Sequence, residues 1–87
     1  MKLIFCKKCQ DVIRLIQEEK RTCRCGECSG QYTDELRAWY KGDAAVPLGF
    51  NGTSFVNAIE NQPAKGFGKD FTAFTIAKKC DTFTKIV

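Results

Sequence analysis

The chain has 87 residues, a formal net charge of +4, six cysteines and no histidine, and this length predicts a single domain over residues 1–87. The lack of histidine excludes Ser-His and Cys-His nucleophile pairs. No apolar run approaches the roughly 20 residues needed to span a bilayer. Because no apolar leader follows Met1, we expect a cytoplasmic protein whose thiols stay reduced rather than paired as disulfides.

Five of the six cysteines lie in the first third of the chain, between short β-prone segments. Residues 2–5 lead into Cys6 and Cys9, and residues 11–16 are rich in β-branched side chains, so both segments predict strands. A polar connection leads to a second thiol group over residues 21–28, and residues 31–33 predict another short strand. Two close-set thiol groups can reach one tetrahedral ion, so the pattern predicts a structural metal site.

Five thiols compete for the four ligand positions of such a site. Cys6 and Cys9 form the first pair, and Gly26 favours Cys25 as the last ligand of the second group, because the turn after a ligand tends to need positive φ. Cys23 is then the fourth ligand, with Cys28 as its competitor. Four thiolates bind zinc or iron alike, and we expect Zn²⁺, with iron as the minor alternative. A zinc-loaded centre of four thiolates would lower the net charge to about +2.

Residues 34–87 predict further strands and one helix. Residues 36–40 fit a hairpin strand or a helix, and residues 44–50 are extended, with Pro47 favouring an edge strand or a bend. A helix is predicted near residues 54–61, capped by Thr53 or Ser54 and ended by Pro63. A flexible loop follows over residues 62–69, then a half-buried strand over 71–76 and a last strand over 82–87. The fold class is therefore α+β and mostly antiparallel β.

Residues 3–33 resemble the zinc-ribbon group, in which two thiol turns at the tips of β-hairpins share one zinc ion. Lys7 and Gln10 stand where that group commonly has Pro and Gly. The resemblance implies an N-terminal zinc ribbon over residues 1–33, extended by the β-rich part over 34–87.

The whole chain also resembles small uncharacterised proteins of bacteria and their phages. The matching segments are Cys23–Gly26, Gly30–Tyr32, Pro47–Gly49 and Phe71–Phe74. This resemblance implies Cys23 and Cys25 as ligands, and it places the protein in the cytoplasm of a bacterium or of a phage-infected cell.

No paired-carboxylate or nucleophile motif is present, so we expect no catalysis. The sequence instead favours a structural-zinc binding module that acts as an interaction or adaptor protein. Two alternatives stay open. One is a small-molecule (nucleotide-like) ligand-binding accessory protein, suggested by the Gly66–Lys69 loop and the aromatic residues. The other is a nucleic-acid-binding zinc ribbon that uses Arg37, Trp39 and Lys41. The partner is thus a protein or a nucleic acid, with no membrane, and a homo-oligomer stays open. Cys80 is interpreted as a buried apolar residue.

Overall fold

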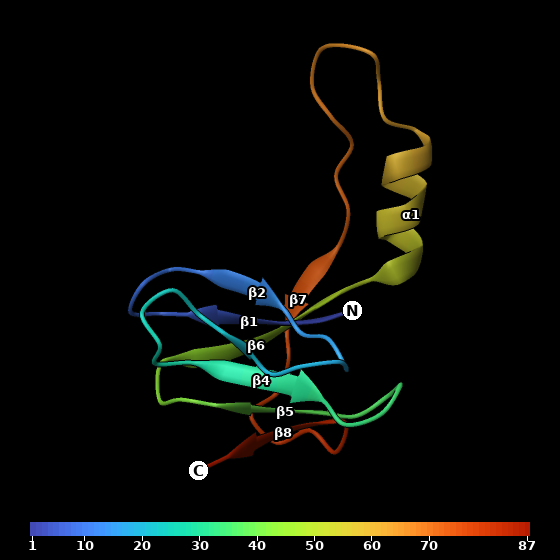
Figure 1. Cartoon of the computed structure of the whole chain (residues 1–87). Coiled ribbons are helices and arrows are strands. Elements are labelled where there is room, and N and C mark those ends of the chain that lie inside the picture. The colour runs from blue at the N-terminus through green and yellow to red at the C-terminus, as the bar shows by residue number, and fades with distance from the viewer.

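The computed structural model describes residues 1–87 as two four-stranded sheets and one helix (Figure 1). The α+β, mostly antiparallel fold class is confirmed. The elements in chain order are β1 (Lys2–Cys6), β2 (Val12–Arg14), β3 (Arg21–Thr22), β4 (Ser29–Tyr32), β5 (Ala38–Lys41), β6 (Ala45–Phe50), α1 (Gly52–Glu60), β7 (Ala73–Thr75) and β8 (Phe83–Ile86).

The two sheets have the strand orders β2-β1-β6-β7 and β3-β4-β5-β8. The first four strands form two hairpins, β1–β2 and β3–β4, one in each sheet, and β1 also pairs with β6 while β4 also pairs with β5. All neighbouring strands are antiparallel except β5 and β8, which run parallel with Ala38 opposite Phe83. The segment between β7 and β8 therefore carries the chain from one sheet to the other.

The core is small and is shared by the two sheets. Only 13 of the 87 residues are buried. The central cluster joins Ile4 and Leu15 to Tyr40 and Phe83, whose rings meet edge to face with centroids 5.0 Å apart. Three cysteines belong to the same cluster of nine buried residues: Cys6, Cys23 and Cys28. Any interaction that fixes these three thiols therefore also stabilises the core.

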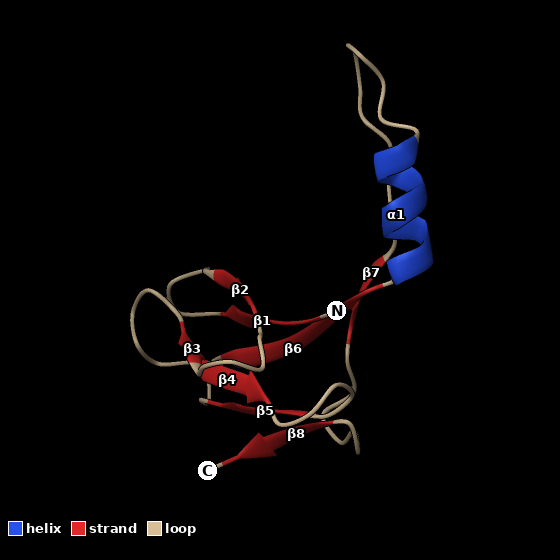
Figure 2. Ribbon diagram, turned by 45° about the vertical axis from the view of Figure 1, so that its right-hand side comes forward, coloured by secondary structure: helices blue, strands red, loops and turns tan.

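Residues 51–72, which we call the arm, project away from the sheets (Figures 1 and 2). The arm contains α1, none of whose residues is buried. The two ends of the arm continue the β6–β7 hairpin. They are joined by a hydrogen bond in which the Asn51 N–H donates to the Thr72 carbonyl at 2.8 Å. Three rings close its base, with centroids 4.8 to 5.5 Å apart: Phe50, Phe55 and Phe71. The molecule is consequently elongated, with extents of 44 × 27 × 24 Å.

Several local expectations are corrected. The N-cap of α1 is Asn51, whose side chain accepts from the Ser54 N–H at 2.9 Å, rather than Thr53 or Ser54. The predicted strand over 71–76 shortens to β7, and all of its residues are exposed rather than half-buried. Apolar and polar residues do alternate in this segment, but Phe74 packs on Gly49 of the neighbouring strand instead of on the core.

Two expectations that the sequence left undecided are now resolved. Residues 38–41 form strand β5, so the helical alternative for 36–40 is wrong. Pro47 lies in β6, between two other strands, rather than in an edge strand. Its carbonyl accepts from the Ile76 N–H at 2.9 Å, just beyond the end of β7. The missing Pro47 N–H faces the same side as that carbonyl, away from β1, so the hydrogen bonds between β6 and β1 are kept and only a bond to the Ile76 carbonyl is lost. No helix of the chain has the length and apolar character needed to cross a bilayer.

Candidate metal centre

Each of the two thiol groups lies on a six-residue turn closed in the same way. The Cys6 N–H donates to the Asp11 carbonyl, and the Cys23 N–H donates to the Cys28 carbonyl, both at 2.9 Å. The first turn connects β1 to β2, and the second connects β3 to β4. Two hairpin tips of equal span therefore present their thiols to one another.

Both turns need a left-handed backbone at the residue after the second thiol. Gly26 has φ of +85°, as expected from its place after Cys25, and Gln10 has φ of +62° after Cys9. Gln10 is the only residue other than glycine with positive φ in the chain. Gln10 thus adopts a backbone conformation that favours glycine.

The turns bring four thiols together. The Sγ atoms of Cys6, Cys9, Cys23 and Cys25 all lie within 4.8 Å of one another. The Sγ atom of Cys25 is 3.7 Å from that of Cys6 and 3.6 Å from that of Cys23. A tetrahedral ion with metal–sulfur bonds of about 2.3 Å requires sulfur–sulfur edges of about 3.8 Å. The donor set and its spacing therefore fit one tetrahedral metal ion.

Backbone N–H groups surround the sulfurs and favour their ionised forms. The pKa of Cys6 is lowered, first by the backbone N–H of Cys9. Burial raises the pKa of Cys9, but the backbone N–H groups of Cys25 and Asp11 outweigh it, so that the net shift is downward. Burial likewise opposes the lowering at Cys23, whose sulfur accepts from the Cys28 N–H at 3.3 Å. These amides can offset the negative charge of a thiolate centre.

The fourth thiol behaves differently from the other three. The backbone N–H of Glu27 lowers the pKa of Cys25, but partial desolvation and the three neighbouring thiols raise it to about 12. Without a cation the Cys25 thiol thus stays protonated at neutral pH, because a fourth thiolate at this spacing would be repelled by the others. A divalent cation supplies the charge that allows the fourth thiol to ionise.

Cys28 lies outside the group of four thiols. It is completely buried, and burial raises its pKa to about 12. Its backbone closes the second turn, and its side chain packs beside Gly42, where an added Cβ would come within 3.1 Å of the Cys28 sulfur. The geometry thus favours Cys23 over Cys28 as the partner of Cys25.

Contacts between the turns were not anticipated from the sequence. The Arg24 N–H of the second turn donates to the Asp11 carboxylate of the first turn at 2.9 Å. Lys8 and Glu27 form an exposed ion pair at 3.1 Å across the same junction, which contributes little to stability. In the sequence, acidic residues alternate with basic ones in this region, which suggests ion pairs. The spacing alone does not show which acid contacts which basic residue.

The other residues singled out from the sequence lie apart from the thiols. Trp39 is half-buried and Lys41 exposed on β5, while Arg37 is held by Asp34 at 3.3 Å. Tyr40, their neighbour, is a core residue. Cys80 is half-buried rather than fully buried, and its sulfur lies 3.5 Å from the Thr82 hydroxyl. The Gly66–Lys69 loop is exposed at the tip of the arm.

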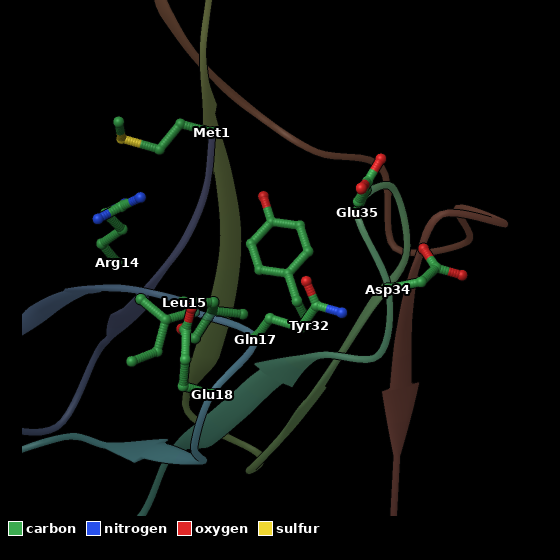
Figure 3. Close-up of a pocket in the computed structure, with 9 residues that line it drawn as sticks. Met1, Arg14, Leu15, Gln17, Glu18, Tyr32, Asp34 and Glu35 are labelled. Atoms are coloured by element: carbon green, nitrogen blue, oxygen red, sulfur yellow. The ribbon is translucent and has the colours of Figure 1, made fainter.

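A cavity of about 260 Å³ opens between Met1, Arg14 and Tyr32 (Figure 3). Two of its polar side chains, Tyr32 and Asp34, have partners in the protein. The Tyr32 hydroxyl accepts from the Lys2 N–H at 2.9 Å, and the Asp34 carboxylate accepts from the backbone N–H groups of Leu36 and Arg37. The Tyr32 hydrogen bond links β4 to β1, and the Asp34 hydrogen bonds stabilise the β4–β5 turn.

Comparison of the chain with protein-family models, with curated proteins and with solved structures gave no match. The four-thiol group is thus the feature from which function must be argued.

Proposed function

We propose that this protein is a zinc-stabilised binding module that acts as an interaction or adaptor protein without catalysis. The observation that carries the proposal is the group of four thiols within 4.8 Å, built on two hairpin turns. All four positions of a tetrahedral ion would be filled by protein ligands, which is typical of structural rather than catalytic zinc. Cys6, Cys9, Cys23 and Cys25 would hold the ion, as in the zinc-ribbon group.

The arm supports the adaptor role. Its apolar side chains Val56, Ile59 and Phe67 are 49%, 56% and 99% exposed. The arm carries two lysines and two acids (Glu60, Lys65, Lys69 and Asp70), so its net charge is zero. A projection with exposed apolar side chains and no net charge suits a protein partner better than a phosphate backbone. In this proposal the metal centre stabilises the sheets, and the arm contacts the partner.

Metal content of the purified protein and of single Cys→Ser variants tests the metal role. Elemental analysis is expected to find one zinc per chain, and colourless protein distinguishes zinc from iron. C9S, C23S and C25S are expected to lose the metal. C28S is expected to keep it, although with lower stability, because its buried sulfur fills the space beside Gly42. C80S is the matched control. Metal loss in C28S together with retention in C23S would reverse the ligand assignment.

Nucleic-acid binding is the second candidate, supported by half-buried Trp39 beside exposed Lys41 on the outer face of β5. Gel shifts with single-stranded and double-stranded DNA and RNA at low salt separate the candidates. The adaptor proposal expects no shift. A salt-dependent shift that is lost in W39A and K41A would favour nucleic acid instead.

A further inference from the structure

A cavity of about 500 Å³ lies where the chain passes from one sheet to the other. Its walls come from both sheets, because Tyr40 of β5 and Lys85 of β8 face Val46 and Pro47 of β6 across it, and the residues after β7 complete it. This volume lies within the range of pockets that hold small organic ligands. The cavity is separate from the four-thiol group, since none of the four cysteines lines it.

The charge of the cavity is positive. Three lysines line it (Lys7, Lys78 and Lys85), together with one acid, Asp43. Lys85 lies 3.9 Å from the Asp43 carboxylate, whereas Lys7 and Lys78 make no ion pair. The lining therefore carries two positive charges in excess, which matches one phosphate dianion.

Tyr40 adds a polar group that the protein does not use. The residue is only 2% exposed, and no hydrogen bond to its hydroxyl is formed within the chain. No fully buried side-chain oxygen or nitrogen lacks a partner, so the Tyr40 hydroxyl keeps some exposed surface, and Tyr40 is one of the residues that line the cavity. Burial, and next the Cys80 thiol, raise the pKa of Tyr40, so the hydroxyl stays protonated and can donate.

Apart from Thr75, the rest of the lining is apolar. Ala45, Val46, Pro47, Ile76 and Ala77 supply it, and the Ile76 N–H donates to the Pro47 carbonyl at 2.9 Å. Tyr40 is held from behind by the Phe83 ring. A preformed apolar wall with a few convergent polar groups is the usual construction of a small-molecule site.

We propose that this cavity binds an organic phosphate monoester, with its phosphate at Lys7, Lys78, Lys85 and the Tyr40 hydroxyl and its apolar body against Val46 and Ile76. The cavity is separate from the four thiols and from the arm, although Lys7 lies in the first thiol turn between Cys6 and Cys9. It also differs from the small-molecule site expected from the sequence, which was placed at the Gly66–Lys69 loop.

Calorimetric titration of the metal-loaded full chain with phenyl phosphate tests the site. Phenyl phosphate is expected to bind saturably, and inorganic phosphate and phenol are each expected to bind at least about tenfold more weakly, because each offers only half of the contacts. K78Q and K85Q are each expected to raise Kd about tenfold through a lost charge-assisted hydrogen bond, and Y40F about fivefold. K20Q, which removes an exposed lysine outside the cavity, is the matched control and is expected to leave Kd unchanged.

Two results would overturn the site. One is the absence of saturable phenyl phosphate binding at millimolar concentration. The other is binding that K78Q and K85Q weaken no more than K20Q does. Amide chemical shifts give a second readout, because phenyl phosphate is expected to shift Val46 and Ala77 and to leave Cys25 unmoved. Zinc content is measured on the same samples, so a zinc-loaded chain that binds no phenyl phosphate overturns this site alone, whereas a folded chain without zinc overturns the proposed function.

Discussion

At the scale of single residues, Gln10 is strained in a position that suits glycine. Its φ of +62° lies in the left-handed region, which costs an L-residue about 1 kcal/mol or more. Because Gln10 follows Cys9 in the first turn and Gly26 follows Cys25 in the second, the two turns offer matched tests of the same backbone requirement. The side chain of Gln10 is exposed, so replacing it removes no core contact.

We expect Q10G to raise the free energy of unfolding of the metal-loaded protein by about 0.5 to 1 kcal/mol, because relief of strain exceeds the added entropy of the unfolded chain. We expect G26A to lower the free energy of unfolding by about 1 to 2 kcal/mol. No atom lies within 4 Å of the added Cβ, so the loss comes only from placing an alanine at a φ of +85°. Guanidinium denaturation measures both. G52A, at an open helical position with ordinary φ, is the control and should cause no loss. Destabilisation by Q10G would show that the Gln10 side chain contributes to the turn.

At the scale of elements, the sheets and the arm differ in how much of them is buried. No residue of α1 is buried, whereas β1 and β5 each bury at least two residues. The β6–β7 ladder already pairs Phe50 with Ala73, and Asn51 bonds to Thr72 just beyond it. The hairpin can therefore close without the arm.

Replacing residues 52–71 with an Asn-Gly turn is therefore expected to preserve zinc content and to cost no more than about 2 kcal/mol, the contacts of the Phe50–Phe55–Phe71 ring group. G30A makes the matched comparison within the sheets. Its added Cβ would lie 2.8 Å from the Trp39 carbonyl oxygen and 2.9 Å from Leu15, so we expect it to cost more than removal of the whole arm. Denaturation midpoints and elemental analysis check both variants. Loss of zinc on arm replacement would show that the arm helps to form the metal site.

The sequence predicted those elements whose signals are local. The β-branched run at residues 11–16 and the alternation at 82–87 identified β2 and β8, and the thiol spacing with Gly26 identified the four thiols that meet. The sequence could not predict that β8 runs parallel to β5, because that pairing joins segments distant in the chain. Nor could it predict the exposure of β7, since alternation records two faces of a strand without showing what covers them. The cavity with Lys7, Lys78 and Lys85 depends on the same long-range pairing.

At the scale of the whole molecule, the four-thiol group and the core are one structure. Cys6 and Cys23 belong to the central buried cluster, and they connect β1 of one sheet to the second thiol turn of the other. A chain that buries only 13 residues has little else to hold the two sheets together. Structural zinc contributes on the order of 10 kcal/mol in small domains, which is comparable to the total stability of a domain.

The response to acid follows from the thiols. Cys6, Cys9 and Cys23 have lowered pKa values in the folded chain, so the stability they contribute is present above the ordinary thiol pKa of 9.0 and is lost as pH falls through the lowered values. Cys25, with its pKa raised to about 12, opposes folding of the metal-free chain once pH rises above the ordinary thiol value. A bound metal ion would keep all four thiols ionised and would therefore remove the destabilising effect of Cys25. Protons would then have to compete with the ion for the sulfurs.

We therefore expect removal of the metal to unfold the sheets. A chelator at neutral pH should abolish the β-sheet circular dichroism of the reduced protein, and added Zn²⁺ should restore it, because the exposed Cys25 gives the chelator access to the centre. Acid is expected to release zinc and to unfold the protein in one transition. C80S, which leaves the four thiols intact, should behave like the wild type. A metal-free chain that keeps its dispersed amide spectrum would show that the core of Ile4, Tyr40 and Phe83 suffices alone, and the proposed structural role of the metal would then fall.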